Sequence, residues 1–508
     1  MRQISKKLLI IYAAAGLVFA GCKKDFLDVN TDPNRVTDDN VTPELIFPNA
    51  AEACGALSFA GARANAAGAK TQLQFAQDWI GYMASNGDFA RDNTETSYNI
   101  DFTFADNLFQ SRYSVLFDLH QAQIKGLATG DTAVAGASMV LTAKMFQELV
   151  DLFGNIPYSQ AFQGAKLTRP AYDNAADIYA DLQKVLDTAI QYFQLPPPSK
   201  FTDETKVVDI VNHGDMQKWT KLANTIKLRL LIRQAEIPGF DPSAEIAKIF
   251  DPAGLGILGA GESVSINPGY VNDVAKQSPF FANYGYTPTG AIAISSTNAN
   301  QYILDIMGAN SDPRIGQFFT PVGSAFVGNA YGDEPGNLNP GNQSSYFGPT
   351  LIGSPSQDQW LMPSYESMFF RAEAAARGWI AEDAQADYEA AVTESFVWTG
   401  LDASDAAAYL TNPNADWANS GTTTEEKVKF ILFQKYIANT GLDPAESYAD
   451  ERRIDFLPPG YISLNPSRVS NTLPVRLLYP QSEYTTNADN VNKQGTINQF
   501  TSKLFWQP

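Results

Sequence analysis

Residues 131–153 read DTAVAGASMVLTAKMFQELVDLF, and this stretch decides the class of fold. Its large apolar residues recur at the spacing of one helix face: Met139, Met145, Phe146, Leu149 and Phe153. Asp131 stands where a helix cap is favoured, and the Gly, Asn and Pro of GNIPYSQAF (154–162) form a stop signal. The stretch therefore predicts a helix that must bury one face against a partner.

Similar helical patterns lie on both sides of this stretch, at 173–195, 215–235, 364–380, 383–399, 424–439 and 445–456. Short connections between such segments favour antiparallel helix pairs. The sequence thus predicts an all-α fold with a helical body at about 49–238 and 364–456.

A different composition separates the two helical parts. Residues 239–363 are rich in Gly, Pro, Asn and Ser and have only brief helical stretches such as 298–308. An insertion of this length is uncommon without a function, so we expect it to carry the ligand face, with at most a small hairpin. Residues 457–508 are predicted to wrap the body, which makes 49–508 one domain.

The N-terminus has the layout of a secretory signal. Positive charges at residues 2, 6 and 7 precede the apolar run LLIIYAAAGLVFA at 8–20, which is shorter than the roughly 20 residues that span a bilayer. Ala20 and Gly21 before Cys22 resemble a bacterial lipobox. We expect residues 1–21 to be a signal peptide, Cys22 a lipid anchor and 22–48 a tether; an ordinary cleaved signal is the alternative.

Charge and motifs exclude several functions. The formal charge of −19 argues against nucleic acid, which is bound by clustered Lys and Arg. With two His and two Cys, and no HExxH, GxSxG, Walker A or GxGxxG motif, the chain lacks the usual reagents for catalysis and metal binding. No catalytic residue, metal or cofactor is predicted, although two carboxylates would suffice for a glycosidase.

Aromatic residues outside the helical pattern are the candidate ligand contacts. A ring beside amide groups suits a neutral, hydroxylated ligand, because the ring covers C–H groups while the amides bond hydroxyls. Rings in two segments, 79–98 and 239–363, are interspersed with Asn and Gln: Trp79, Tyr82, Phe89, Tyr98, Tyr284, Tyr286, Tyr331, Tyr346 and Trp360. Alternatively, these rings fasten irregular loops to the body, and Trp79 has the spacing of a core residue.

An ordered set of segments resembles the SusD/RagB family of outer-membrane nutrient-binding lipoproteins. The segments span nearly the whole chain: FLDVNTDPN (26–34), DLFGNIPYSQAFQG (151–164), YDNAADIYADL (172–182), GDMQKWTKLANTIKLRLLIR (214–233), SDPR (311–314), FFRAEAAARGW (369–379) and RLLYPQSEYTTNADNV (476–491).

The resemblance implies tetratricopeptide-like helix pairs and a lipid-anchored, cell-surface protein of the outer membrane. It also implies a non-enzymatic role, in which the protein captures oligosaccharides and delivers them to a partner, a TonB-dependent SusC-type transporter. Oligopeptide cargo, a surface glycoside hydrolase and a structural lid without ligand remain alternatives. The family's binding residues have no matching motif here, so the candidate rings rest on composition.

Overall fold

The computed structural model describes residues 41–63, 71–196 and 208–508. The predicted signal peptide and Cys22 lie outside the described residues. Within the described chain, the compact unit begins at Pro43, earlier than the predicted residue 49, because PELIFP already belongs to the first described helix.

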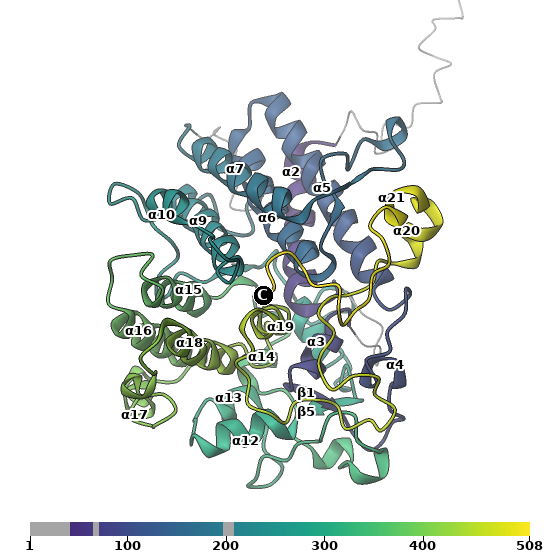
Figure 1. The fold of residues 1–508 in the computed structure, drawn as a ribbon, viewed down its shortest axis with the longest axis vertical. Coiled ribbons are helices and arrows are strands. Elements are labelled where there is room, and N and C mark those ends of the chain that lie inside the picture. Colours follow the sequence, from purple (N-terminus) through teal and green to yellow (C-terminus); the bar gives the residue numbers. More distant parts are fainter. Residues whose placement is uncertain (1–40, 64–70, 197–207) are drawn as a thin grey trace, which may run out of the picture. The chain divides into compact units, whose positions relative to one another are not determined.

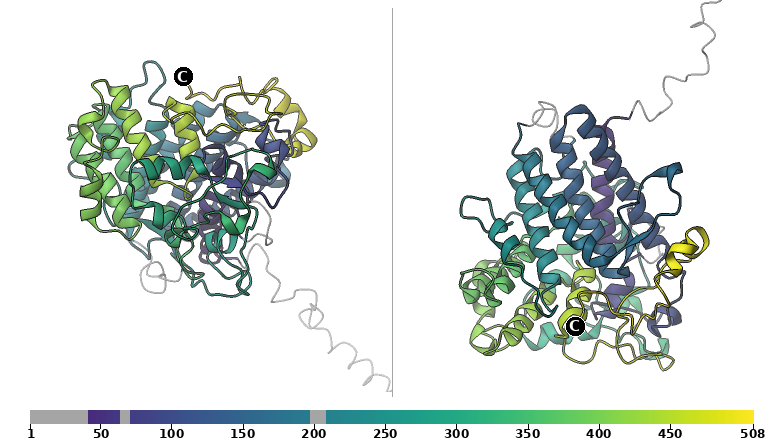
Figure 2. Two further views of the ribbon diagram at one scale, coloured as in Figure 1. Left: turned by 90° about the horizontal axis from the view of Figure 1, so that it is seen from below. Right: turned by 45° about the horizontal axis from the view of Figure 1, so that its top comes forward.

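The N-terminal part of the chain forms a row of packed helices (Figure 1). Helix α2 packs on α5, α5 on α6, α6 on α7 and α7 on α9. The right-hand view of Figure 2 shows these helices side by side. The helices of this part are α2 (Pro43–Gly55), the π-helical turn η3 (Ala56–Ala60), α3 (Gln74–Trp79), α4 (Asn93–Thr96), α5 (Asp106–Thr129), α6 (Thr132–Phe153), the short η4 (Gly164–Lys166), α7 (Ala175–Phe193), α9 (Met216–Arg233) and α10 (Ser243–Ile249).

Local sequence signals fix the ends of these helices. The Asp131 side chain accepts a hydrogen bond from the Val134 backbone 3.1 Å away, as the capping pattern predicts. Helix α6 ends at Gly154, whose φ of 77° is a conformation that favours glycine. The helix predicted from residues 131–153 is thus confirmed.

The C-terminal helices complete the body. Helix α15 packs on α16, α18 and α9, and so joins the two helical parts. The helices are α15 (Ser364–Ala376), α16 (Ala384–Trp398), α17 (Ala403–Tyr409), η7 (Trp417–Asn419), α18 (Thr424–Ala438), α19 (Pro444–Ile454), α20 (Gln481–Thr486) and α21 (Ala488–Asn492). The all-α, tetratricopeptide-like prediction is confirmed.

The region at 239–363 contains short elements, of which α12, α13 and β5 lie at the end of the unit opposite α5–α7, whereas α10 lies beside α9 (Figure 1). Its helices are α11 (Pro279–Tyr284), α12 (Gln301–Ala309), α13 (Ile315–Phe318), η5 (Pro335–Asn337), η6 (Gly341–Gln343) and α14 (Pro349–Ile352). The described strands are β1 (Met83–Ser85), β2 (Ile156–Pro157), β3 (Tyr172–Asp173), β4 (Val264–Ile266), β5 (Thr297–Ala299) and β6 (Gln359–Met362).

These strands form two-stranded antiparallel sheets: β1 with β5, β2 with β3, and β4 with β6. A small hairpin, as expected within the insertion, forms at residues 285–293, where Tyr286 pairs with Ile292 in an antiparallel bridge. The insertion also contains the pairing of β4 with β6, which lie far apart in the sequence. The β1–β5 sheet joins the insertion to the chain just after α3.

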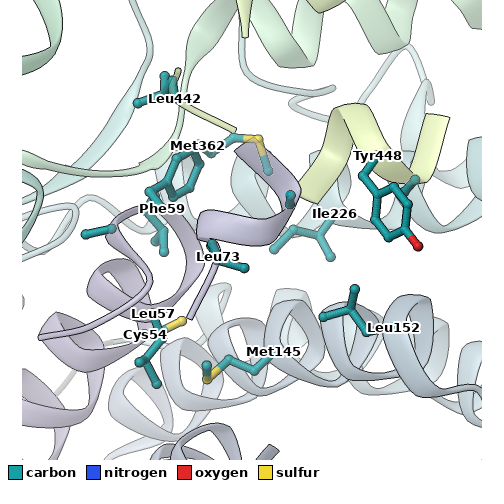
Figure 3. Packing of buried hydrophobic residues seen from close by; sticks show 14 of the residues in the cluster. Cys54, Leu57, Phe59, Leu73, Met145, Leu152, Ile226, Met362, Leu442 and Tyr448 are labelled. Atoms are coloured by element: carbon teal, nitrogen blue, oxygen red, sulfur yellow. The ribbon is translucent and has the colours of Figure 1, made fainter. Parts of the chain in front are cut away.

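A large apolar core fills the space between these elements (Figure 3). Cys54 lies in it with no exposed surface, and burial raises the pKa of its thiol to about 12. The Cys54 side chain is therefore a small, unreactive core residue.

A buried ionic network ties four helices together within the core. The Arg233 guanidinium of α9 lies 3.1 Å from the carboxylate of Asp151 in α6 and 3.3 Å from that of Asp450 in α19. Lys435 of α18 contacts Asp450 at 2.8 Å. Since an unpaired buried charge is strongly unfavourable, this network fixes α6 and α9 of the N-terminal part against α18 and α19 of the C-terminal part.

Candidate binding site

Five of the nine predicted rings lie inside the core. Their side chains are between 0 % and 4 % exposed, and of these residues Tyr331 also lines a cavity of about 480 Å³ beside α12: Trp79, Tyr82, Tyr98, Tyr284 and Tyr331. The alternative, that such rings fasten loops to the body, describes these five.

Hydrogen bonds explain the buried positions of two of them. The Tyr82 hydroxyl donates to the carbonyl of Tyr436 at 2.5 Å, and the Tyr98 hydroxyl accepts from the Ser463 backbone N–H at 2.8 Å. A buried hydroxyl needs such a partner. Both tyrosines therefore join segments that are distant in the sequence.

Trp360 occupies a separate place on strand β6. Its ring is half-buried and packs against Phe280 and Trp398, with ring centroids 5.1 Å and 5.7 Å away. It does not line the pocket that contains Phe89 and Tyr346.

Phe89 and Tyr346 meet in a pocket of about 230 Å³ beside the β1–β5 sheet. Phe89 is 43 % exposed, and Tyr346 forms a largely buried wall. The loop after β1, the loop before β5 and the 341–346 segment together line the pocket: Asp88, Phe89, Ile292, Ser295, Asn298, Gly341, Asn342 and Tyr346. We call this the Phe89 pocket.

Two buried amides hold the three loops around the Phe89 pocket. Asn86 donates to the side-chain oxygen of Asn298 at 2.7 Å and to the carbonyl of Ser295 at 2.7 Å. Asn298 in turn donates to the carbonyl of Gly341 at 3.2 Å. The Asp88 carboxylate accepts the Gly341 N–H at 2.8 Å. The walls are therefore fixed before any ligand binds.

Two tyrosines lie at or near the pocket, Tyr346 in its wall and Tyr286 beside it. The Tyr346 hydroxyl donates to the Ile294 carbonyl at 3.2 Å, and burial raises the pKa of Tyr346. Tyr286, 39 % exposed, pairs through its backbone with Ile292, whose side chain is 46 % exposed. Tyr286 and Ile292 thus extend the apolar surface beyond the pocket itself.

The chemistry of the Phe89 pocket suits a neutral ligand with apolar and hydroxylated faces. Asn342 and Ser295 are exposed beside the two rings and can bond hydroxyls. The volume lies below the roughly 300–1,000 Å³ of pockets for drug-sized ligands, so the pocket fits one residue of a chain. Among the described residues that line the pocket, Asp88 is the one carboxylate, whereas glycosidases require a pair.

Sequence reasoning missed Asp88, Ile292 and Ser295 as pocket residues. Their types are common in loops, and only the pairing of β1 with β5 brings them together. The Asn86–Gly87 break after the helical pattern was the one local signal that pointed to the loop containing Phe89.

Neither a metal-binding cluster nor a membrane-spanning helix is found among the described residues. No group of three or more His, Cys, Asp and Glu in the described ranges could hold a metal ion. In the same ranges, every helix is too short or too polar to cross a membrane.

Comparison with known proteins identifies the family. Residues 55–480 match the SusD-like family model described as starch-binding associating with outer membrane. A chitin-binding SusD homolog from Flavobacterium johnsoniae has a TM-score of 0.69 at 23 % identity, covering 86 % of this chain and 93 % of its own.

Two solved structures from Bacteroides have the same fold. A SusD/RagB family protein from Bacteroides thetaiotaomicron has a TM-score of 0.71 at 20 % identity, covering 92 % of this chain and 99 % of its own. An outer membrane protein from Bacteroides vulgatus, described as probably involved in nutrient binding, has a TM-score of 0.70 at 21 % identity, covering 92 % and 100 %.

A search of curated proteins found no match. The family match covers most of the chain, and the family and these relatives are described by binding rather than catalysis, in agreement with the prediction of a non-enzymatic protein. The chain therefore belongs to the SusD-like family, which is described as starch-binding associating with outer membrane.

Proposed function

We propose that this protein captures neutral oligosaccharides at the cell surface and that one sugar residue occupies the Phe89 pocket. The observation that carries this proposal is the exposed Phe89 ring beside the Asn342 amide, on walls fixed by Asn86 and Asn298. A sugar residue would place its C–H face on the ring and its hydroxyls on Asn342 and Ser295.

Titration calorimetry of the purified protein tests the cargo. Neutral oligosaccharides of several linkages and mixed peptides are titrated separately, and heat is expected with at least one oligosaccharide. If only peptides produce heat, the cargo is an oligopeptide and not an oligosaccharide. If neither class produces heat, the protein is a structural lid that binds no ligand by itself.

Delivery to a TonB-dependent SusC-type transporter is the second part of the proposal. The family's association with the outer membrane supports it, and so does the predicted signal peptide at 1–21, which is followed by Cys22. Affinity purification from outer membranes is expected to bring down a large β-barrel protein. Metabolic labelling with palmitate is expected to mark the wild type but not Cys22→Ser; equal labelling of both would refute the anchor.

A further inference from the structure

A second cavity, of about 450 Å³, shares no lining residue with the Phe89 pocket and lies between α5, the 157–170 segment and α20. Aromatic side chains form one wall: Phe109, Tyr113 and Phe162. The ring centroids of Phe109 and Tyr113 are 4.7 Å apart, and those of Tyr113 and Phe162 are 6.2 Å apart. We call this the Phe162 cavity.

The backbone at Phe162 adopts an unusual conformation that places its ring in this wall. Its φ is +64°, in the region that favours glycine and is strained for a bulky residue. The ring packs against His120 at 5.5 Å and Phe146 at 6.3 Å. Strain of this kind concentrates at functional sites, although packing alone also sustains it.

Glu483 is the one charged residue among the described residues that line the cavity. Its Oε2 atom accepts hydrogen bonds from the Tyr172 hydroxyl at 2.8 Å and the Asn487 amide at 3.2 Å. No Lys or Arg of the described chain forms an ion pair with Glu483. Burial and the negative charge of Glu483 raise the pKa of Tyr113. The carboxylate is thus fixed in place next to the rings and lacks a cation.

Uncharged polar groups complete the lining. Gln110 and Ser114 are exposed one helical turn apart on α5. Neither side chain has a hydrogen-bond partner among the described residues. An aromatic wall attracts a cation through the ring quadrupole, and a carboxylate binds it directly. Hydroxyl and amide groups beside them suit a ligand that also carries hydroxyls.

We propose that the Phe162 cavity binds an amino sugar, with its ammonium group at Glu483 and its ring against Tyr113 and Phe162. Gln110 and Ser114 bond the hydroxyls of the ligand. The strongly acidic chain, with a formal charge of −19, favours the approach of such a cation. This site is separate from the Phe89 pocket, and its ligand differs by carrying a positive charge.

Calorimetry with a matched pair of ligands tests the proposal on the full chain. The probe is the β-1,4-linked dimer of glucosamine at pH 6, where its amines are charged, and the comparator is the same dimer with both amines acetylated. We expect Glu483→Gln to weaken binding of the amine dimer about tenfold, because a charge-assisted hydrogen bond is lost. The glutamine keeps an oxygen that can accept from Tyr172.

Asp489→Asn is the matched control, since it removes one negative charge from the neighbouring α21 without lining the cavity. It is expected to leave the affinity within about twofold. Equal losses in the two variants would show a general field effect and overturn the site. An equal loss of affinity for both dimers in Glu483→Gln would also overturn it, because the effect would not depend on the charge of the amine.

A third variant separates this inference from the proposed function. Phe89→Ala is expected to leave binding of the amine dimer unchanged. If it abolishes that binding instead, the dimer occupies the Phe89 pocket and the second site is refuted, while the proposed function stands. Circular dichroism melting of each variant checks that it is folded.

Discussion

The side-chain amide of Asn86 donates a hydrogen bond to the side-chain oxygen of Asn298, which is 212 positions later in the chain and 2.7 Å away. Both side chains are buried beneath the Phe89 pocket. One contact therefore links the loop after β1 to strand β5, and it sets the distance between the pocket walls.

Removing this contact is expected to weaken both the fold and the site. Asn298→Ala leaves the buried Asn86 amide short of one acceptor, and the free energy of unfolding should fall by about 1–3 kcal/mol. Urea denaturation measures the loss. The control Asn342→Ala changes an exposed amide and should shift stability by less than about 0.5 kcal/mol while still weakening sugar binding. Unchanged stability in Asn298→Ala would contradict the scaffold role.

Phe89→Ala is expected to reduce affinity for the cargo oligosaccharide about two- to tenfold, since a ring contact contributes about 0.5–1.5 kcal/mol beyond its buried area. The melting temperature should not change, because the ring is 43 % exposed. Phe117→Ala, equally exposed at 43 % but located on α5, is the matched control and should bind the oligosaccharide normally. Equal affinities of the two variants would argue against the Phe89 pocket.

Glu366 makes stability depend on pH in an unusual direction. Burial raises its pKa to about 8, assisted by Asp443 and Glu446, and neither of its carboxylate oxygens has a hydrogen-bond partner in the described chain. The folded state therefore keeps a proton that the unfolded state releases near pH 4.5, so stability falls as pH rises from about 4.5 to about 8.

Glu366→Gln is accordingly expected to stabilise the protein at pH 7, by up to about 3 kcal/mol, and to have little effect near pH 4. Chemical denaturation at several pH values measures this. A variant that is destabilised equally at all pH values would show that the carboxyl makes contacts that glutamine cannot replace.

Glu373 makes stability depend on pH in the opposite direction to Glu366. Burial alone would raise its pKa, but Arg453 and Arg377 lower it to about 2. The ionised Glu373 carboxylate stabilises the folded state above pH 4.5, and this stabilisation is lost as pH falls toward 2. Glu373→Gln should therefore destabilise the protein at pH 7 by about 3–5 kcal/mol, because it leaves the Arg453 charge buried with one partner fewer. A stabilising effect at pH 7 would contradict the ion-pair assignment.

Arg233 connects α6, α9 and α19, and its loss should be among the most damaging single changes in the core. Arg233→Met is expected to lower the free energy of unfolding by about 3–5 kcal/mol, since Asp151 and Glu446 lose a buried cation. The exposed Lys276→Met, which breaks a surface pair with Asp273, should change the free energy of unfolding little, because solvent screens the pair. Similar losses in the two variants would show that the network contributes little.

Helices were predictable because their signals are local. The apolar spacing in 131–153 and the Asp131 cap lie within one segment, and the structure places α6 at Thr132–Phe153. Which individual rings are buried could not be predicted, because burial depends on partners that are distant in the sequence. Nothing near Tyr82 indicates that its hydroxyl meets the carbonyl of Tyr436, 354 positions away.

The binding pocket falls between these two cases. Phe89 and Tyr346 were predicted from composition, and the structure brings both to one pocket. Their neighbours Ile292 and Ser295 depend on the pairing of β1 with β5, which is a long-range register that strand pattern alone does not specify.

A crystal structure of the protein with a bound neutral oligosaccharide tests the central claim most directly. The account predicts electron density for a sugar ring against Phe89, with hydroxyls within hydrogen-bond distance of Asn342 or Ser295. Density for the oligosaccharide at another surface, with the Phe89 pocket empty at saturating ligand, would contradict it.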